Sequence, residues 1–418
     1  MRSVWKRSIG KAEDWTGSPG LGAPSILSET KTDDLTGDRI HPPPEDKVLE
    51  MIVKKAVSVC TRLTAEFNDF SDSSCSEVVS VAFDMASIGR VNVDMIAPAA
   101  FNKVREIFVV SDKMLIQSIN QDLVGGVSKG KSGSFFFFTP DQKFVLKTLK
   151  ASELLVLQQS LLKDYVDYVL KYPNTLLPRF YACFVISFKF ITYRFFLSNN
   201  VFDTKLSIHE IYDLKGSLVG RSTLSSSTEK EAQGAALKDQ EFRDRKRRLC
   251  FQKTLLLIFK LQLQSDILFL QDHGLMDYSL LVGIHSSSGE IKDSTSSSRS
   301  PSITFESVNE SIRRLKKFRK ERKKLKESEL GRKLIQETPE GVSVFQRDVG
   351  GLKARKPEGA ELNEIYFIGI IDIFQRYSIQ KTLETAIQSL THDKKQISSI
   401  DVVEYAARFL EFIESIVQ

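Results

Sequence analysis

Two aspartates stand alone in stretches that otherwise look like protein interior. Asp277 lies in GLMDYSLLVGIH (residues 274–285) and Asp372 lies in IYFIGIIDIF (residues 365–374). An ionised carboxylate in an apolar setting is costly unless it is paired, hydrogen-bonded or bound to a cation. We therefore expect each acid to have a partner and to lie at the end of a buried strand or in a tight loop. For either acid alone, a buried arginine or a helix N-terminus is the more common partner.

A lysine precedes both acids in the chain. Lys147 lies on the second strand of a predicted hairpin, GKSGSFFFFTPDQKFVLKTLK (residues 130–150), which folds around the turn TPDQ. The small residues of GKSGS would let backbone N–H groups approach phosphate oxygens, and a nearby lysine would neutralise those oxygens. The GKSGS turn matches neither a dinucleotide-binding fingerprint nor a Walker loop, so taken alone it is read equally well as a plain hairpin turn.

The order lysine, acid, acid indicates phosphoryl transfer. That reaction needs one carboxylate to orient the attacking hydroxyl, a second to hold Mg2+ against the nucleotide phosphates, and a lysine on those phosphates. Lys147, Asp277 and Asp372 could supply the three parts. Only their joint occurrence favours this chemistry over separate structural ion pairs.

The elements that must position these residues follow from the spacing of apolar residues. Helical spacing predicts helices, and β-rich runs bounded by turn residues predict strands. The predicted helices cover residues 48–60, 101–108, 151–171, 238–272 and 402–417. Besides the hairpin, the predicted strands cover residues 180–197, 208–217 and 365–374.

Composition predicts an ordered core with two disordered segments. The chain has 418 residues, of which 41% are hydrophobic, enough for one large two-lobed domain or two ordinary domains. Residues 1–45 are rich in Gly, Ser, Thr, Asp and Pro without a period, which predicts a disordered tail. Residues 286–344 contain a serine tract and the basic run RRLKKFRKERKKLK (residues 313–326), which predicts a disordered insertion.

Charge and cysteine usage narrow the class of protein. A net charge of +6 favours anionic partners such as phosphate, nucleic acid or an acidic membrane surface. The four cysteines are scattered, which argues against a disulfide framework or a zinc site. The N-terminus lacks the apolar segment of a signal peptide, and no apolar run reaches the roughly 20 residues of a membrane-spanning helix. We expect an intracellular protein.

Several stretches together resemble the phosphatidylinositol phosphate kinase family. They are REIF, GKSGSFFFFTPDQKFVLKT, TLLPRFY, YDLKGSLVGR, MDYSLLVGIH and IYFIGIIDIFQRYSIQKTLE. The combination of YDLKGS with MDYSLL is very specific. The resemblance runs from residue 101 to the C-terminus, interrupted by the insertion. It implies an α+β, two-lobed, kinase-like fold, with an antiparallel sheet in an N-terminal lobe (residues 46–200) and both acids in a C-terminal lobe (residues 201–418).

The resemblance implies a role for each candidate residue. Asp277 would face the lipid hydroxyl, Asp372 would hold the metal and Lys147 would contact the ATP phosphates, so the implied cofactors are ATP and Mg2+. The turn that covers the nucleotide falls on Gly130, Ser132, Gly133 and Ser134. The hinge that borders the adenine falls on Asn199, Asn200, Val201 and Phe202. Further phosphate contacts fall on Lys215 and Arg221.

Substrate choice in the family depends on a loop after the metal acid. Enzymes that phosphorylate position 5 of phosphatidylinositol 4-phosphate resemble KKLE there, whereas the type that uses the 5-phosphate isomer has alanine in place of the glutamate. This chain has Lys381 and Glu384 in the stretch KTLE, which favours 5-kinase activity. One lysine of the pair is missing, as is the family's proline before the tyrosine in SSIDVVEYAARF. A less basic loop should bind anionic membrane less tightly, and one hypothesis is that the basic insertion compensates.

The expected reaction is transfer of the ATP γ-phosphoryl group to the 5-hydroxyl of phosphatidylinositol 4-phosphate, giving phosphatidylinositol 4,5-bisphosphate. Two alternatives stay open: a catalytically weak phosphoinositide-binding scaffold with the same fold, and a kinase acting on the 5-phosphate isomer. A protein-serine kinase is disfavoured because the HRD loop and the DFG triplet are missing.

The resemblance also implies partners and a location. We expect peripheral binding to anionic membranes that hold phosphatidylinositol phosphate, with no transmembrane segment and no nucleic-acid partner. The expected location is the cytoplasm and the inner face of the plasma membrane, with the nucleus as a second compartment. Family members often form homodimers, although no residue in this sequence indicates one.

Overall fold

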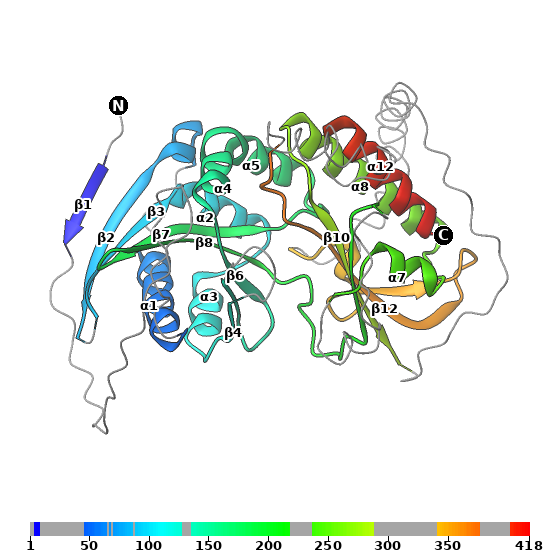
Figure 1. The fold of residues 1–418 in the computed structure, drawn as a ribbon, viewed down its shortest axis with the longest axis horizontal. Helices are drawn as coiled ribbons and strands as arrows, with labels where there is room; N and C mark the ends of the chain where they lie inside the picture. Colours follow the sequence, from blue (N-terminus) through cyan, green and yellow to red (C-terminus); the bar gives the residue numbers. More distant parts are fainter. Residues whose placement is uncertain are drawn as a thin grey trace, which may run out of the picture.

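Two β-sheets lie next to each other, each packed with helices (Figure 1). This arrangement comes from a computed structural model, which describes residues 4–8, 46–64, 67, 70–86, 88–127, 135–217, 236–287, 341–376 and 402–418. We call the first sheet with helices α1 to α5 the N-terminal lobe, and the second sheet with α7, α8 and α12 the C-terminal lobe. The predicted α+β fold class is confirmed.

The first sheet has eight strands in the order β1-β2-β3-β7-β8-β6-β5-β4. All neighbours are antiparallel except β1 and β2, which run parallel. β-branched and aromatic residues dominate the central strands, as packing on a half-buried pleated surface favours. The strands are β1 (Val4–Ser8), β2 (Val78–Met85), β3 (Gly89–Ile96), β4 (Val124–Val127), β5 (Phe135–Phe138), β6 (Phe144–Thr148), β7 (Phe180–Phe188) and β8 (Ile191–Asn199).

Helices bury one face each against this sheet and against one another. In α1 the fully buried Leu49, Ile52, Val53 and Ala56 follow helical spacing. Helix α1 packs along α3 on one side of the sheet, and α2 contacts β7 and α5 (Figure 1). The elements are α1 (Asp46–Thr64), η1 (Asp72–Ser76), α2 (Pro98–Ile107), α3 (Asp112–Ile119), α4 (Ala151–Val156), the π-helical turn η2 (Leu157–Leu161) and α5 (Leu162–Lys171).

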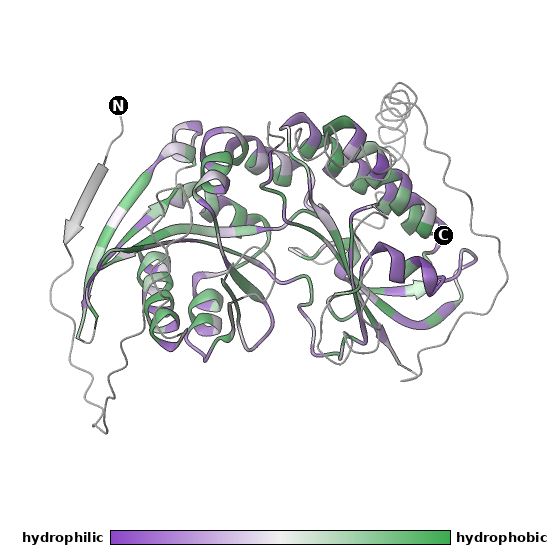
Figure 2. Ribbon diagram, in the orientation of Figure 1, coloured by the Kyte–Doolittle hydropathy of each residue, from purple (hydrophilic) through white to green (hydrophobic). Residues whose placement is uncertain are grey.

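The second sheet has four antiparallel strands in the order β11-β12-β10-β9. Helices α8 and α12 run alongside each other over this lobe, and Figure 2 shows both apolar and polar residues along each of them. The elements are β9 (Glu210–Leu214), α7 (Asp239–Asp244), α8 (Lys253–Asp272), β10 (Ser279–Ser286), η3 (Val344–Gln346), β11 (Leu352–Arg355), β12 (Glu361–Ile371) and α12 (Val402–Ile416).

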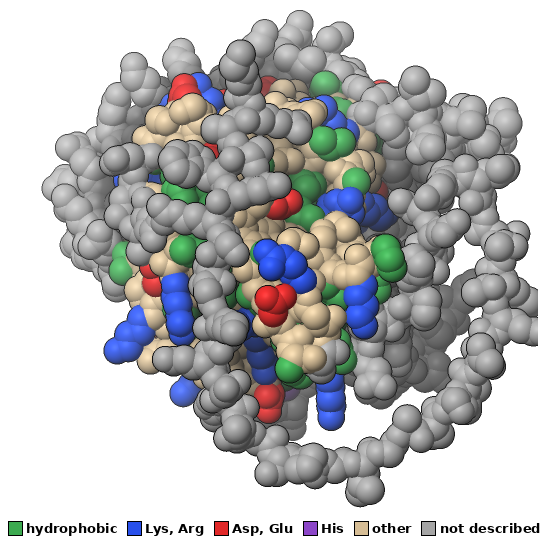
Figure 3. Space-filling view, turned by 90° about the vertical axis from the view of Figure 1, so that its left-hand side faces the viewer, with side chains coloured by type: hydrophobic (Ala, Val, Ile, Leu, Met, Phe, Trp, Pro, Cys, Tyr) green, Lys and Arg blue, Asp and Glu red, His purple; other side chains and the backbone are tan. Residues whose placement is uncertain are grey.

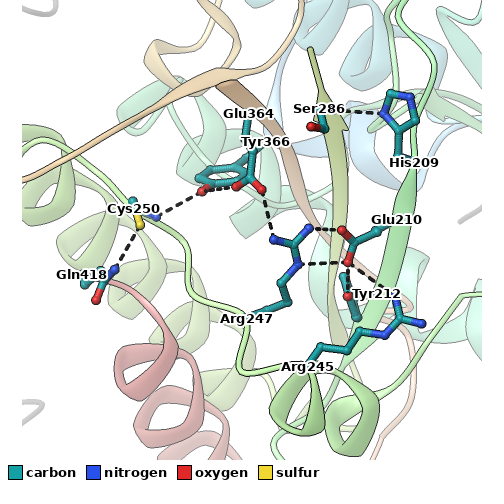
Figure 4. A network of polar contacts seen from close by, with 10 residues as sticks. All are labelled: His209, Glu210, Tyr212, Arg245, Arg247, Cys250, Ser286, Glu364, Tyr366 and Gln418. Atoms are coloured by element: carbon teal, nitrogen blue, oxygen red, sulfur yellow. Dashed lines mark hydrogen bonds and ion pairs between the residues drawn. The ribbon is translucent and has the colours of Figure 1, made fainter. Parts of the chain in front are cut away.

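Arg247 ties two strands together at one end of the second sheet (Figure 4). Its Nε donates to Glu210 of β9 at 3.0 Å, and its Nη1 donates to Glu364 of β12 at 3.0 Å. Tyr212 also donates to Glu210, and an Arg245 nitrogen lies 3.7 Å from it. Glu210 is buried, so these partners compensate the cost of its charge. These contacts fix the first residues of β9 and β12. The C-terminal ends of both strands lie at the opposite end of the sheet.

Asp266 of α8 holds the two lobes together from inside. Its fully buried carboxylate accepts hydrogen bonds from the hydroxyls of Tyr168 and Thr175, at 2.6 and 2.7 Å, and from the Leu176 N–H at 2.8 Å. The Leu176 carbonyl in turn accepts from the Ile370 N–H of β12 at 2.7 Å. Burial raises the pKa of the Asp266 carboxyl to about 6, although its hydrogen bonds act in the opposite direction.

The structure corrects three predictions about the course of the chain. Residues Val4–Ser8, predicted in the disordered tail, form strand β1, while the rest of residues 1–45 lies outside the described residues. The predicted insertion at 286–344 is too long, because Ser286 ends β10 and residues 341–344 are ordered; residues 288–340, with the basic run 313–326, are not among the described residues.

The third correction concerns the predicted helix over residues 238–272, which is two helices. The break falls between α7 and α8, where Leu249 and Phe251 are fully buried. The Leu249 N–H donates to the Ile416 carbonyl at 2.9 Å and the Phe251 N–H donates to the Gln418 carbonyl at 2.7 Å. Backbone pairing with the C-terminus therefore replaces helical hydrogen bonds in this segment.

Among the described helices, α8 is long and apolar enough to cross a membrane by length and composition. Its apolar residues, however, are mostly buried inside the protein, as in the core helix of a folded domain. The expectation that no apolar run reaches the length of a membrane-spanning helix is therefore corrected. The apolar composition of α8 is explained by its packing inside the protein.

Basic and acidic side chains lie side by side on the end of the N-terminal lobe that faces away from the C-terminal lobe. Figure 3 looks onto this end and shows basic, acidic and hydrophobic side chains interspersed among the described residues. Arg90 of β3 lies 3.9 Å from Asp84 of β2. Phe190, in the turn between β7 and β8, is 94% exposed, but single exposed apolar side chains are normal on protein surfaces.

Replacing Asp266 by asparagine should flatten the pH dependence of stability. The carboxyl pKa is about 6 in the folded protein against an ordinary value of 3.8. Between these values the folded state binds more protons than the unfolded state, so the free energy of unfolding falls as the pH rises. Urea unfolding at pH 5 and pH 7.5 should therefore give the parent chain a larger loss of stability than D266N, by on the order of 1 kcal/mol.

D266N should also be less stable at both pH values, by about 1 to 3 kcal/mol, because an amide group would face the Leu176 N–H donor. The same pH slope in the parent chain and in D266N would contradict the assigned pKa.

Candidate active site

A cavity of about 190 Å³ lies where the two lobes meet. Strands β5, β6 and β8 and residues 175–180 form its N-terminal wall, and residues 368–374 form its C-terminal wall. Most of the lining is apolar, including Val145, Phe196 and Ile371, while Lys147 and Asp372 add charge. An apolar cavity with a few converging polar groups is the usual form of a small-molecule site.

Lys147 and Asp372 form an ion pair across the lobes. Lys147 lies on β6 opposite Phe196 of β8, and its ammonium group also lies 5.1 Å from the centre of the Phe136 ring. Asp372 directly follows β12. The side chains are 18% and 47% exposed, so both can reach a ligand in the cavity.

Phe374 explains why the end of β12 reaches Lys147. Its ring lies against Phe180 and Phe196, with centroid separations of 5.2 and 5.7 Å, and only 6% of it is exposed. Because Phe196 is the strand partner of Lys147, docking Phe374 there brings Asp372, two residues earlier, to the lysine. Burial of aromatic surface therefore positions a charged contact.

Lys215 and Asp277 form a second pair at the edge of the C-terminal sheet, with Nζ and Oδ1 3.1 Å apart. Lys215 directly follows β9, and Asp277 precedes β10 by two residues. Antiparallel register pairs Leu214 with Leu280 and Ser279 with Ile371. Strands β9, β10 and β12 are neighbours, so Lys215, Asp277 and Asp372 lie at the same end of the sheet. The usual spacing of strands places the backbones of these residues within about 10 Å of one another.

Both acids adopt a backbone conformation that is rare for residues other than glycine. Asp277 has φ of 66° and Asp372 has φ of 61°, in the left-handed region. Aspartate tolerates this region better than most side chains, and such residues cluster at functional sites. Beyond the strands, the Met276 N–H donates to the Gln375 carbonyl at 2.9 Å, which holds the two acid-bearing loops side by side. The prediction of lone acids in tight loops at strand ends is confirmed.

The predicted hinge lies at the cavity, but its residues differ in role. Asn199, Asn200 and Val201 line the cavity. The Asn200 amide donates to the Gln142 carbonyl at 2.8 Å, which ties the hinge to the turn of the β5–β6 hairpin. Phe202 is not part of the cavity lining and instead packs against Gly283 of β10.

Seven other predicted site residues lie outside the described residues, and their assignments stay predictions. They are Gly130, Ser132, Gly133 and Ser134 of the glycine- and serine-containing turn, and Arg221, Lys381 and Glu384.

Sequence reasoning missed the part of the cavity wall that follows the insertion. Ser343, Phe345 and Gln346 line the cavity, and Gln346 accepts a hydrogen bond from Arg179 at 2.7 Å. The Arg179 guanidinium lies 4.3 Å from the centre of the Phe108 ring. The TLLPRFY resemblance contained Arg179, whereas Ser343 falls in the predicted insertion (residues 286–344), and Phe345 and Gln346 directly after it belong to no predicted element.

Asp372 fits the way in which proteins hold Mg2+ beside nucleotides. In the part of the chain that the structure describes, no group of three or more His, Cys, Asp or Glu side chains could form a metal site by itself. Mg2+ in kinase sites is usually held by one or two carboxylates together with substrate phosphates and water. A partly exposed carboxylate on the wall of a cavity, as Asp372 is, meets that requirement.

Comparison with known proteins agrees with this geometry. The family model described as Phosphatidylinositol-4-phosphate 5-Kinase matches residues 118–416, which include both lysine–aspartate pairs. A probable phosphatidylinositol phosphate kinase of Dictyostelium discoideum is 33% identical over 354 residues, covering 79% of this chain and 48% of that protein. Phosphatidylinositol 4-phosphate 5-kinase 6 of Arabidopsis thaliana is 35% identical over 329 residues, covering 76% of this chain and 44% of that protein.

The type-1 beta phosphatidylinositol 4-phosphate 5-kinase of Gallus gallus is 32% identical over 331 residues, covering 76% of this chain and 57% of that protein. The chain thus spans about half the length of the curated relatives it matches. The family match includes residues of both lobes, from 118 to 416, and confirms the resemblance inferred from the motifs. The chain belongs to the phosphatidylinositol-4-phosphate 5-kinase family.

Proposed function

We propose that the protein transfers the γ-phosphoryl group of ATP to the 5-hydroxyl of phosphatidylinositol 4-phosphate, producing phosphatidylinositol 4,5-bisphosphate. The observation that supports this most is the arrangement of the two pairs: Lys147 and Asp372 in the cavity, and Lys215 and Asp277 outside it on the same sheet edge. One pair suits a nucleotide and the other suits an acceptor hydroxyl. The names of the relatives support the same substrate class.

The nucleotide half of the reaction would use the cavity. Its apolar walls suit a purine ring, and the hinge residues 199–201 border it. The Lys147 ammonium group would move from Asp372 to the phosphate oxygens of ATP. Mg2+, when bound by Asp372 and the phosphates, would neutralise phosphate charge.

The acceptor half would use Asp277 and Lys215. The Asp277 carboxylate would accept a hydrogen bond from the inositol hydroxyl and take its proton as the oxygen attacks. Lys215, now 3.1 Å from Asp277, would keep the carboxylate oriented and face the developing phosphoryl charge. Phosphoryl transfer has a loose transition state, so positioning and charge neutralisation would supply most of the catalysis.

Selectivity and location complete the proposal. Glu384 would select the 4-phosphate isomer, while Lys381, Arg221 and the basic run 313–326 would meet anionic lipid. The protein would act peripherally at the inner face of the plasma membrane, reached from the cytoplasm, with the nucleus as a second site of action. A homodimer would be compatible with this placement.

The reaction is tested by incubating the protein with radiolabelled ATP, Mg2+ and vesicles that contain either monophosphate isomer. The label transferred to lipid is then measured. The parent chain should label phosphatidylinositol 4-phosphate, and D277N should lower kcat about 10²- to 10⁴-fold because the hydroxyl loses its proton acceptor. D84N, at the exposed Asp84 of β2, is the matched control and should label lipid normally. Label in protein without label in lipid would indicate a protein kinase. Phosphoinositide binding without any label would indicate a scaffold.

Narrowing the cavity tests whether it holds the nucleotide. A Cβ at Gly369 would lie 2.7 Å from the Cγ2 of Val201, so G369A should push Val201 into the cavity. We expect the KM for ATP to rise about tenfold, with little change in the KM for lipid. Adding V201A to G369A removes the clash and should restore the KM for ATP. An unchanged KM for ATP in folded G369A would exclude this cavity as the nucleotide site.

Replacing Glu384 by alanine tests isomer selectivity. E384A should lower the ratio of kcat/KM for the 4-phosphate isomer to that for the 5-phosphate isomer by about tenfold or more. K381A is the control, since loss of a general membrane contact should lower kcat/KM for both isomers equally. An unchanged ratio in E384A would show that selectivity lies elsewhere.

A further inference from the structure

A buried carboxylate lies directly behind Lys215. Asp239, the first residue of α7, is fully buried. Its Oδ1 accepts hydrogen bonds from the backbone N–H groups of Lys215, at 2.9 Å, and of Gly216, at 2.7 Å. Burying a carboxylate costs free energy unless hydrogen bonds compensate it, and charge-assisted bonds to backbone N–H groups are among the stronger ones. Asp239 therefore fixes the backbone from which the Lys215 side chain extends.

Helix α12 holds the same turn from the other side. Gly216 has φ of +70°, and a Cβ there would lie 3.1 Å from the Arg408 carbonyl oxygen and 3.2 Å from the Phe409 Cα. The turn thus needs glycine both for its conformation and for its close approach to the α12 backbone. With Asp239 on one side and α12 on the other, the turn has little freedom to shift.

The same helix reaches the loop that carries Asp277. The Tyr405 hydroxyl of α12 donates to the carbonyl of Tyr278, the residue after Asp277. Arg408, one turn later, is 4% exposed, and its positive charge interacts with both Asp239 and Asp277. Both halves of the Lys215–Asp277 pair are therefore held against α12.

A role for Asp239 confined to capping α7 does not explain these contacts. The N-terminus of α7 already has a cap, because Glu241 accepts from the Lys238 N–H at 3.0 Å. The Asp239 Oδ1 instead points to a turn 23 and 24 residues earlier in the chain. Its bonds go to the segment that carries a candidate site residue.

We propose that Asp239 is a positioning residue of the active site: its hydrogen bonds to the Lys215 and Gly216 N–H groups set Lys215 at the correct distance from Asp277. This inference rests on the proposed function, in which Lys215 and Asp277 handle the acceptor hydroxyl. Displacement of a catalytic group by about 1 Å can cost roughly 100-fold in rate, so a residue that never touches substrate can control kcat.

Two substitutions separate hydrogen bonding from charge. D239N keeps an oxygen at Oδ1 and so can keep both backbone hydrogen bonds, whereas D239A removes them. We expect D239A to lower kcat about 10- to 100-fold, and D239N to retain kcat within about fivefold. The KM for ATP should change less than about threefold in both, because Asp239 does not line the cavity. E210Q is the matched control, since Glu210 is a buried acid at the opposite end of β9.

E210Q should lower the melting temperature while the folded enzyme keeps its kcat and pH profile. D239A should instead lower kcat in the folded enzyme, because the Lys215 side chain is no longer fixed at 3.1 Å from Asp277. The proposal is overturned if D239A keeps kcat within threefold, if D239N loses as much kcat as D239A, or if the KM for ATP rises in step with the loss of kcat.

Amide hydrogen exchange gives a second readout that does not depend on activity. D239A, but not D239N, should speed exchange in peptides covering residues 210–217 and 274–280, with peptides from the N-terminal lobe unchanged. If the parent chain phosphorylates no phosphoinositide, the proposed function is wrong. The exchange data then still decide whether Asp239 positions the loops that carry Lys215 and Asp277. Equal exchange rates in D239A and the parent chain would refute this positioning role.

Discussion

The docking of Phe374 between the two sheets is the contact on which the arrangement of the site depends, because it decides whether Lys147 and Asp372 can form their ion pair. The ion pair exists only if β6 and the end of β12 lie in one particular relative position. Phe374 sets that position by docking on Phe180 and Phe196, and Phe196 is itself the strand partner of Lys147. A nonpolar contact thus determines where a polar one forms. A ligand can then replace the ion pair without the lobes separating, since the aromatic contact does not involve the charged atoms.

In the C-terminal sheet, the ion pairs that hold the strands together and the candidate catalytic residues lie at opposite ends of the same strands. At one end, Arg247 joins the start of β9 to β12 through the carboxylates of the buried Glu210 and the partly exposed Glu364 (Figure 4). At the other end the strands stop, and Lys215, Asp277 and Asp372 continue into loops. Antiparallel pairing makes this division possible, because β10 begins where β9 and β12 end. Rigid strands fix the loop anchors, so the loops can carry rare backbone angles without losing their position.

How far the sequence predicts this site depends on the contrast between a residue and its neighbours. Asp277 and Asp372 were predictable because a lone acid in an apolar run is conspicuous. The hairpin that carries Lys147 was predictable because a polar turn separates two largely apolar strands. Asp239 was not predictable, since it is flanked by the polar residues Lys238 and Gln240 and its partners lie 23 and 24 residues away. Strand β3 was missed although Arg90, Asn92 and Asp94 alternate with buried apolar residues, which is the signal of a half-buried strand. The break before α8 was missed because residues 245–252 contain no Gly or Pro, and only the pairing of Leu249 with the C-terminus shows that the segment is extended.

Four aspartates in this chain each have identified partners and differ in exposure. Asp239 and Asp266 are 0% exposed, and backbone and side-chain donors fill their acceptor positions. The side chains of Asp277 and Asp372 are 29% and 47% exposed, and each is paired with a lysine. A fully enclosed carboxylate surrounded by short, fixed donors cannot exchange partners without unfolding its surroundings, so it suits the framework. A carboxylate held by a long, flexible lysine can exchange that partner for a substrate hydroxyl or a bound cation at little cost, because lysine carries its own charge to the phosphates. The identity of the partner, more than the acid itself, therefore distinguishes the reactive aspartates from the structural ones.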